Sequence, residues 1–414
     1  MEPLPKTEGK PLVGLNSFGF GGTNAHLVFE QYEAPAAEFS VPQDRLLPLL
    51  LTAKSKDSLI GLVKALLPRL ETADDATFNR TASALFHQRE HLAHRLYAEG
   101  TSAAALAAEL KKYVQNGEVP EKASFACGRD AAGCVKTAFI YSGNGSQWVG
   151  MGRELYKADP EFKASVDRTD RCFKAIAGWS PAAYLQQDDK AWDLNDASVV
   201  QPLLFTVEAA MTDSLRAAGI TADLYMGHSA GEAAAAWASG ALTLEDAVTV
   251  IWHRSRQQQT LAGTGAMAVA RLEAKKFEEL LSAYPTVSVA ARNAEGDYTV
   301  GGTTEGIAAF VAAVKASGGK AQQLALNIAF HNPVMEVLKP AFLQAVEGIH
   351  PRKTERFCST VTGQLETTLD AAYWWKNLRQ TVEFQAGTEA LVAAGVRRFA
   401  EIGPHSILLG YVKH

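Results

Sequence analysis

One short stretch of the sequence constrains the fold more than any other, because it predicts a strand, a sharp turn and a helix in direct succession. The apolar run 224–226 leads into GHSAG at 227–231, and an alanine-rich segment, 232–237, follows. In such a Gly-x-Ser-x-Gly turn the glycines avoid clashes with the strand and the helix, and the serine hydroxyl is lifted into the open. The first amides of the helix then point at any oxygen that becomes negative during attack. The pattern indicates an α/β fold with Ser229 as a candidate nucleophile.

Length, composition and charge exclude several classes of protein. The chain has 414 residues, of which 47% are hydrophobic and 21% charged, so we expect two or three domains with a sizeable core. The net charge of −5 argues against a nucleic-acid partner, since such proteins carry a basic surplus. No apolar run reaches the length of a membrane span, and the first residues lack the apolar centre of a signal peptide. We therefore expect a cytoplasmic protein without a membrane partner.

The cysteines and one histidine cluster are the candidates for disulfide or metal sites. Four cysteines occur without a CxxC pair, namely Cys127, Cys134, Cys172 and Cys358. This arrangement predicts reduced, mostly buried thiols. Three histidines have spacings of four and three, which on one continuous helix could present metal ligands: His87, His91 and His94. No fourth ligand is evident, so we interpret them as a solvated helix end and expect no metal site.

The N-terminal part predicts a short tail, residues 1–35, and a small α+β linker domain, residues 36–130. Strands are expected at 47–53, 95–98 and 123–126, and helices at 58–67, 76–87 and 102–113. Asp57 is a plausible cap of the first helix, and Pro68 is expected to end it. We find no chemistry in this linker.

The remaining residues, 131–414, predict a larger α/β domain. Strands at 137–141, 223–226 and 398–402 alternate with helices such as 201–218 and 243–259. This alternation predicts an α/β-hydrolase-like fold with a mostly parallel sheet and helices on both faces. Between about 264 and 326 the order becomes strand, helix, strand, strand, helix, strand, which predicts an inserted ferredoxin-like subdomain.

A serine is a poor nucleophile at neutral pH and needs a base. The same domain offers five histidines, which are His228, His253, His331, His350 and His405. The side chain of His228 would point away across the turn. His331 lies in a loop just before a proline, but the residues alone leave His331 and His405 as equal candidates.

Two groups of motifs carry a family resemblance. The phrase GFGGTNAH at 19–26 resembles the C-terminal end of a β-ketoacyl synthase domain, which implies that residues 1–35 are a ketosynthase tail and that His26 has no catalytic role. Five further motifs occur in order: SGNGSQ at 142–147, GHSAGE at 227–232, HRSRQQQ at 253–259, IAFH at 328–331 and EIGPH at 401–405. From about Lys136 onward the chain resembles malonyl-CoA:acyl carrier protein acyltransferases, in particular the acyltransferase domains of type I polyketide synthases.

The resemblance implies the roles of the central residues. Ser229 would be the nucleophile and His331 its base, while the backbone amides of Ala230 and Asn144 would form an oxyanion hole. The family usually has glutamine where this chain has Asn144, and a backbone amide tolerates that change. Arg254 would bind a substrate carboxylate as a bidentate fork.

Orientation and selectivity follow from the same resemblance. A backbone carbonyl of the segment 403–405, in place of a carboxylate, would orient His331. A bulky Phe330 before the histidine accompanies malonyl, whereas serine there accompanies methylmalonyl. Ile328 and Ala230 depart from the commonest residues and weaken that inference. Gln147 and Asn293 are expected to line the pocket.

These residues imply an acyltransferase that loads malonyl from CoA, through a seryl ester, onto the phosphopantetheine thiol of an acyl carrier protein in polyketide biosynthesis. Acyl-CoA, the carrier protein and the ketosynthase domain of the same polypeptide are the implied partners, and no tightly bound cofactor is expected. The alternatives are a serine thioesterase or hydrolase, methylmalonyl or another acyl specificity, and a docking scaffold in which Ser229 is idle.

Overall fold

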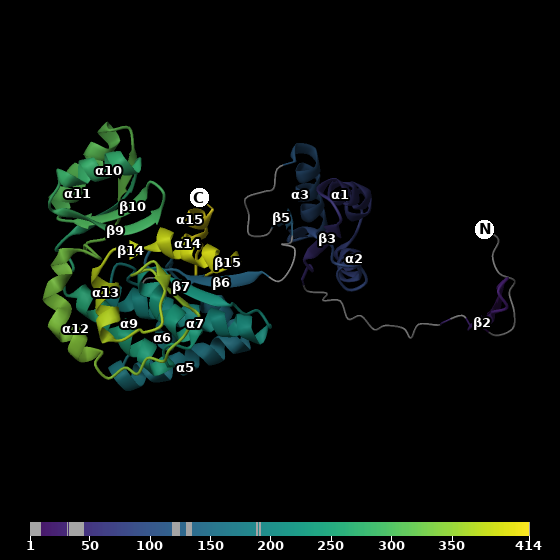
Figure 1. Cartoon of the computed structure of the whole chain (residues 1–414), viewed down its shortest axis with the longest axis horizontal. Coiled ribbons are helices and arrows are strands. Elements are labelled where there is room, and N and C mark those ends of the chain that lie inside the picture. The colour runs from purple at the N-terminus through teal and green to yellow at the C-terminus, as the bar shows by residue number, and fades with distance from the viewer. Residues whose placement is uncertain are drawn as a thin grey trace. The chain divides into compact units, whose positions relative to one another are not determined.

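The chain divides into two compact units, 1–132 and 133–414, which are described separately. The computed structural model describes residues 10–30, 32, 45–117, 125–129, 135–187, 189 and 192–413. Figure 1 shows the helices and strands of each unit in chain order. Several predicted features lie outside these ranges. They are residues 1–9, 31 and 33–35 of the predicted tail, Cys134, and the first two residues of the predicted strand 123–126.

The first unit contains a hairpin and a small α+β layer. The hairpin strands, β1 (Leu12–Phe18) and β2 (Asn24–Glu30), pair antiparallel and are exposed along their length. A second antiparallel sheet has the order β3 (Leu49–Ala53), β4 (His94–Ala98), β5 (Phe125–Arg129). Its helices are α1 (Lys56–Leu70), α2 (Asp75–His87) and α3 (Ala103–Asn116). The strands and helices expected here from the sequence are therefore present, with shifted ends.

Two details of α1 correct the sequence prediction. The helix is capped by Ser55, whose hydroxyl accepts from the Ser58 amide at 3.1 Å, and not by Asp57. Pro68 does not end the helix but lies in its last turn. Burial of Leu67 and Leu70 holds that turn against the unit's core, which offsets the hydrogen bond that a proline cannot donate.

The histidine and cysteine predictions have separate outcomes. His87 ends α2, and His94 begins β4. His91 lies in the loop between these elements, with its Nε2 2.8 Å from the Phe86 carbonyl oxygen. The three histidines therefore do not share a helix face. In the described ranges no group of His, Cys, Asp or Glu could hold a metal ion.

The described cysteines are free thiols. Among them only Cys358 is buried, and Cys127 and Cys172 are half-buried, which corrects the expectation of mostly buried thiols.

The second unit is built on a five-stranded sheet with the order β13-β12-β7-β6-β15. Its strands are β6 (Lys136–Tyr141), β7 (Leu224–Gly227), β12 (Phe357–Ser359), β13 (Gln364–Leu365) and β15 (Val396–Ile402). All neighbours pair parallel except β13, an antiparallel edge. The predicted α/β fold with a mostly parallel sheet is confirmed.

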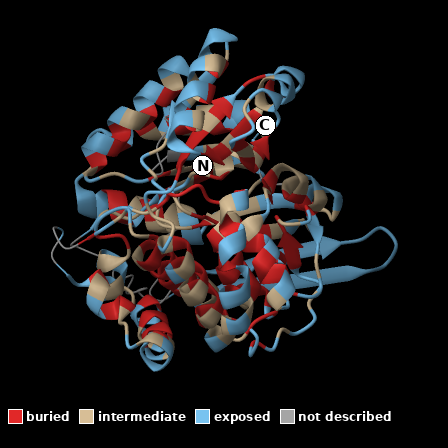
Figure 2. Ribbon diagram, turned by 90° about the vertical axis from the view of Figure 1, so that its left-hand side faces the viewer, coloured by how far each residue is buried: buried red, intermediate tan, exposed pale blue. Residues whose placement is uncertain are grey.

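Helices bury both faces of this sheet. They are α4 (Arg153–Ala158), α5 (Pro160–Ala177), α6 (Pro181–Leu185), α7 (Ala197–Ala217), α8 (Glu232–Ser239), α9 (Leu244–Gln259), α12 (Lys339–Ala345), α13 (Ala371–Arg379), α14 (Phe384–Ala393) and α15 (Leu409–Val412). Along β6, Phe139 and Tyr141 pack into the core shared with α7, α8 and α9, whereas Ala138 and Ile140 face the core shared with α14. Figure 2 shows the resulting pattern, in which buried residues gather inside and the outward helix faces are exposed.

The inserted subdomain has the six elements expected from the sequence. They are β8 (Ala266–Arg271), α10 (Ala274–Ser282), β9 (Val287–Ala294), β10 (Asp297–Gly302), α11 (Thr304–Ala316) and β11 (Lys320–Gln323). Their antiparallel sheet has the order β11-β8-β10-β9, and β14 (Val382–Glu383) adds to β9 in parallel. Phe277 stacks on Tyr298 in its core with ring centroids 3.7 Å apart. β14 comes from the larger subdomain and forms the edge strand of the insert's sheet, next to β9 (Figure 1).

Candidate active site

The turn between β7 and α8 presents Ser229. The short 3₁₀ turn Ser229–Gly231 joins the strand to the helix, and Ser229 has a φ of 54°, which is unusual for a residue with a side chain. A Cβ on Gly227 would lie 2.2 Å from the Glu232 amide nitrogen, and one on Gly231 would lie 2.4 Å from the Tyr141 carbonyl oxygen. Only glycine therefore permits this turn, which holds the serine hydroxyl clear of its own backbone.

His331 meets Ser229 from a loop 102 residues further along the chain. Its Nε2 lies 2.6 Å from the Ser229 Oγ, and its Nδ1 lies 2.8 Å from the Gln380 carbonyl oxygen. Because a carbonyl can only accept, Nδ1 must carry the proton and Nε2 is left to accept from the serine hydroxyl. His331 also has a φ of 54°, so both members of the pair have strained backbones.

The carbonyl that orients His331 corrects the expectation from the sequence. It belongs to Gln380, between α13 and β14, and not to the segment 403–405. In that segment the Pro404 carbonyl accepts from Trp148 Nε1 at 3.0 Å, and His405 is exposed. The structure thus brings His331, and not His405, to the serine.

Burial decides the charge state of the histidine. His331 is 5% exposed, and burial, with a smaller contribution from the Arg254 charge, lowers its pKa to about 3. The imidazole is therefore neutral at physiological pH and able to accept a proton. Burial also lowers the pKa of His228, whose Nε2 lies 2.9 Å from Asn293 Oδ1 and whose ring forms no hydrogen bond with the serine hydroxyl in the described structure.

Arg254 approaches the serine hydroxyl from α9. Its Nη2 donates to Ser229 Oγ at 2.9 Å. Nη1 donates to Gln201 at 2.7 Å and to Gln258 at 3.1 Å, and Nε donates to Asn377 at 3.0 Å. The side chain is 1% exposed. Burial lowers the pKa of Arg254 to about 10, so the guanidinium stays protonated at neutral pH. Ser229 Oγ thus accepts from a cation and donates to a neutral imidazole.

A cavity of about 230 Å³ lies above this pair, between the large subdomain and the insert. Four of the residues expected at the site from the sequence line it together with Ser229, namely Asn144, Asn293, Phe330 and His331. Apolar side chains that the sequence did not single out form much of the remaining wall, and they are Met267, Val269, Leu324, Leu326, Ile407 and Tyr411. The site therefore combines a polar end at the serine with an apolar channel.

The other predicted site residues lie close to the cavity without lining it. Gln147 and Ile328 line a separate small pocket beside it, and Gln147 Oε1 accepts from the Gly145 amide at 2.6 Å. Ala230 is buried at the start of the turn into α8. A Cβ on Gly143 would lie 2.6 Å from the His228 carbonyl oxygen, so a glycine is needed for the loop containing Asn144 to reach the turn.

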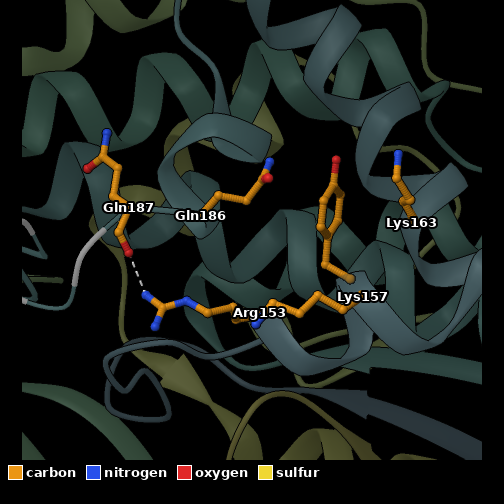
Figure 3. Close-up of a pocket in the computed structure, with 6 residues that line it drawn as sticks. Arg153, Lys157, Lys163, Gln186 and Gln187 are labelled. Carbon is orange, nitrogen blue, oxygen red and sulfur yellow. Dashed lines mark hydrogen bonds between the residues drawn. The ribbon is translucent and has the colours of Figure 1, made fainter.

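A larger cavity elsewhere in the unit lacks this chemistry. It measures about 500 Å³ and is lined by Arg153, Tyr156, Lys157, Lys163, Gln186 and Gln187 (Figure 3). Arg153 donates to the Gln187 carbonyl at 2.6 Å, the bond drawn dashed, and Lys163 pairs with Asp167 at 2.5 Å. Its cations are already engaged and it contains no nucleophile, so size alone does not identify the site.

Comparison with known proteins defines the class. Residues 138–414 match the family described as the acyl transferase domain, and residues 1–98 match the ketoacyl-synthetase C-terminal extension. The chain belongs to the acyltransferase family. More particularly, it is an acyltransferase domain of the modular type I polyketide synthase kind, preceded by a ketosynthase C-terminal extension and linker.

The chain is similar to parts of several large synthases. It is 34% identical over 422 residues to polyketide synthase GfsA of Streptomyces halstedii, covering 98% of this chain and 6% of that protein. It is 32% identical over 415 residues to the pikromycin polyketide synthase component PikAIII of Streptomyces venezuelae, covering 98% of this chain and 26% of that protein. The chain thus spans only a small part of these curated relatives.

Solved structures share the fold. The acyltransferase domain from module 8 of the salinomycin polyketide synthase superposes with a TM-score of 0.79 at 31% identity, covering 89% of this chain and 87% of that one. The malonyl CoA-acyl carrier protein transacylase from Clostridium perfringens superposes with a TM-score of 0.61 at 27% identity, covering 67% and 89%. In the part of the chain that the structure describes, no helix has the length and apolar character needed to cross a membrane.

The lowered pKa of His331 gives a test of the expectation that His331 is the base for acylation of Ser229. A folded-state pKa of about 3 lies below the ordinary value of 6.5, so the proton-accepting form persists as the pH falls through 6.5. We expect the acylation rate, measured by rapid quench with labelled acyl-CoA, to stay nearly constant between about pH 5 and 8. A rate that halves near pH 6.5 would contradict this assignment of the base.

Proposed function

We propose that this chain transfers a malonyl group from CoA, through an ester on Ser229, to the phosphopantetheine thiol of an acyl carrier protein. The observation that carries the proposal is the buried cation of Arg254, 2.9 Å from a hydroxyl that is also 2.6 Å from a neutral His331. A hydrolase of neutral esters has no use for a buried arginine beside its nucleophile. A substrate with its own carboxylate does, because the guanidinium can donate to that group and compensate its charge.

In the first half-reaction, the Ser229 hydroxyl attacks the thioester carbonyl while His331 Nε2 takes its proton. The oxygen that becomes negative is proposed to be bound by the backbone amides of Ala230 and Asn144. The position of Ala230 in the turn that leads into α8 and the close approach of the loop containing Asn144 support this role. When the carbon–sulfur bond breaks, the CoA sulfur leaves with the proton from His331.

In the second half-reaction, the carrier-protein thiol gives its proton to His331 and attacks the seryl ester. The carbon–oxygen bond then breaks, Ser229 regains its proton from the imidazolium, and the malonyl thioester leaves. The apolar wall of the cavity favours this outcome over hydrolysis because it limits the access of water. A serine thioesterase remains the alternative activity.

The preference for malonyl over methylmalonyl is part of the proposal. Phe330 is 6% exposed, lines the cavity, and directly precedes His331. A bulky ring there would crowd an α-methyl group on the acyl chain. Ile328 is buried and lines the neighbouring pocket, so we expect it to act on selectivity through its packing.

The partners belong to the proposal as well. The match of residues 1–98 to a ketosynthase extension supports a ketosynthase domain in the same polypeptide. The carrier protein is proposed from the family, whose members include the Clostridium perfringens transacylase named above. The donor, malonyl-CoA, is a substrate and not a resident cofactor, and a cytoplasmic location stays a prediction.

Mass spectrometry of the intact protein tests the chemistry. After brief exposure to malonyl-CoA, the wild-type chain should gain one malonyl group, whereas Ser229→Ala should gain none because it lacks the attacking oxygen. Ser282→Ala, at the exposed end of α10, is the matched control and should load like wild type. Absence of an adduct with malonyl-, methylmalonyl- and acetyl-CoA would refute the proposed activity.

Substitution of Phe330 tests the selectivity. Phe330→Ser removes the ring that would crowd an α-methyl group, so the ratio of methylmalonyl to malonyl loading in a competition assay should rise. A single methyl group in an apolar pocket is worth about 1–3 kcal/mol, so we expect a change of roughly tenfold or more. Phe330→Leu, which keeps apolar bulk, is the control with a smaller shift. An unchanged ratio in Phe330→Ser would show that selectivity lies elsewhere.

A further inference from the structure

The charge of Arg254 has no direct partner. Among the described residues no carboxylate forms a salt bridge with it, and the groups that accept from its nitrogens are three neutral amides and the Ser229 hydroxyl. An unpaired buried cation is costly, so the protein must compensate it at a longer distance. The compensating group is Glu232, whose charge favours protonation of Arg254.

Glu232 is the first residue of α8 and is fully buried. Its Oε1 accepts from the Thr360 amide at 2.5 Å, and its Oε2 accepts from the Tyr373 hydroxyl at 2.7 Å and from Asn377 Nδ2 at 2.8 Å. Burial raises the pKa of Glu232, while these donors lower it. Two of the donors are N–H groups that cannot accept, which is the environment that a carboxylate requires.

Asn377, on α13, joins the two charges and is 3% exposed. Its Oδ1 accepts from Arg254 Nε at 3.0 Å, and its Nδ2 donates both to Glu232 Oε2 at 2.8 Å and to the Ser229 carbonyl at 3.1 Å. The arginine can only donate, and the other two partners can only accept, so one orientation of the amide satisfies all three. Its side chain thereby links the cation, the anion and the backbone of the nucleophile.

We propose that Asn377 is a positioning residue for carboxylate recognition. It links Arg254 to the compensating negative charge of Glu232 and keeps the Glu232 carboxylate out of contact with the guanidinium. This inference rests on the proposed function, in which Arg254 binds the substrate carboxylate. A carboxylate in direct contact would occupy the fork and neutralise it. The intervening amide accepts from Nε, and the remaining N–H of Nη2, next to Ser229 Oγ, is left for the substrate. The bond to the Ser229 carbonyl fixes the spacing between the fork and the nucleophile.

The isosteric variant Asn377→Asp tests the idea because it changes charge and donors but not shape. It removes both N–H donors, places a carboxylate against Glu232, and sets that carboxylate beside the Nε of Arg254. Glu232→Gln removes the compensating anion, and its single amide oxygen cannot accept from both the Thr360 amide and Asn377 Nδ2, so one of these donors loses its acceptor. Both variants should displace or neutralise the guanidinium of Arg254. Tyr373→Phe is the matched control, since it removes a bond to Glu232 but keeps Asn377 and its contacts.

The experiment is single-turnover loading of the whole chain with malonyl-CoA and acetyl-CoA, with folding checked by circular dichroism. We expect the malonyl-to-acetyl ratio of kcat/KM to fall at least tenfold in Asn377→Asp and in Glu232→Gln, and little in Tyr373→Phe. Equal losses for both donors would mean a merely structural role and would overturn the inference. If Asn377→Asp does not fold, Glu232→Gln decides by the same ratio. Failure of the wild type to load malonyl would instead defeat the proposed function, and the inference with it.

Discussion

The site depends on a positive charge held in the interior beside a serine hydroxyl. Arg254 is 1% exposed and donates to Ser229 Oγ, which in turn lies next to the neutral Nε2 of His331. Removing a guanidinium from water is unfavourable, and the surrounding structure offsets that cost with amide oxygens from α7, α9 and α13. These helices thus serve the site as much as the core, because each contributes an acceptor to the same cation.

Backbone strain is concentrated at the two residues proposed to react. Ser229 and His331 are the described residues other than glycine with a positive φ, at 54° each. Strain of this kind persists only where neighbouring structure enforces it. At Ser229 the close contacts around Gly227 and Gly231 do so, and at His331 the bond to the Gln380 carbonyl fixes the ring. The geometry needed for the proposed proton transfer is therefore set before a substrate binds.

The sequence predicted the parts of the fold that local patterns determine. The strand-turn-helix around Ser229 and the six elements of the insert follow from periodicity and glycine placement, and they occur in the predicted order. The sequence predicted the ends of helices less accurately. At α1 the hydroxyl of Ser55 caps the start, and the burial of apolar residues beside Pro68 lets the helix continue past that proline.

The support of the site could not be predicted in the same way. The carbonyl that orients His331 comes from 49 residues away, and the amide that holds Arg254 Nε comes from 123 residues away. No local signal marks Gln380 or Asn377, since one acts through its backbone and the other is an ordinary polar residue of an amphipathic helix. The three-dimensional fold, in which a residue of α13 hydrogen-bonds to residues of α8 and α9, brings them to the serine.

The central claim is that Arg254 binds the carboxylate of the acyl group. The most direct measurement is single-turnover loading of Arg254→Ala with malonyl-CoA and with acetyl-CoA. Loss of one partner of a buried charged pair costs about 2–5 kcal/mol, so malonyl loading should fall by roughly 30-fold or more, while acetyl loading, which needs no clamp, should change far less. Equal losses for the two donors would contradict the claim.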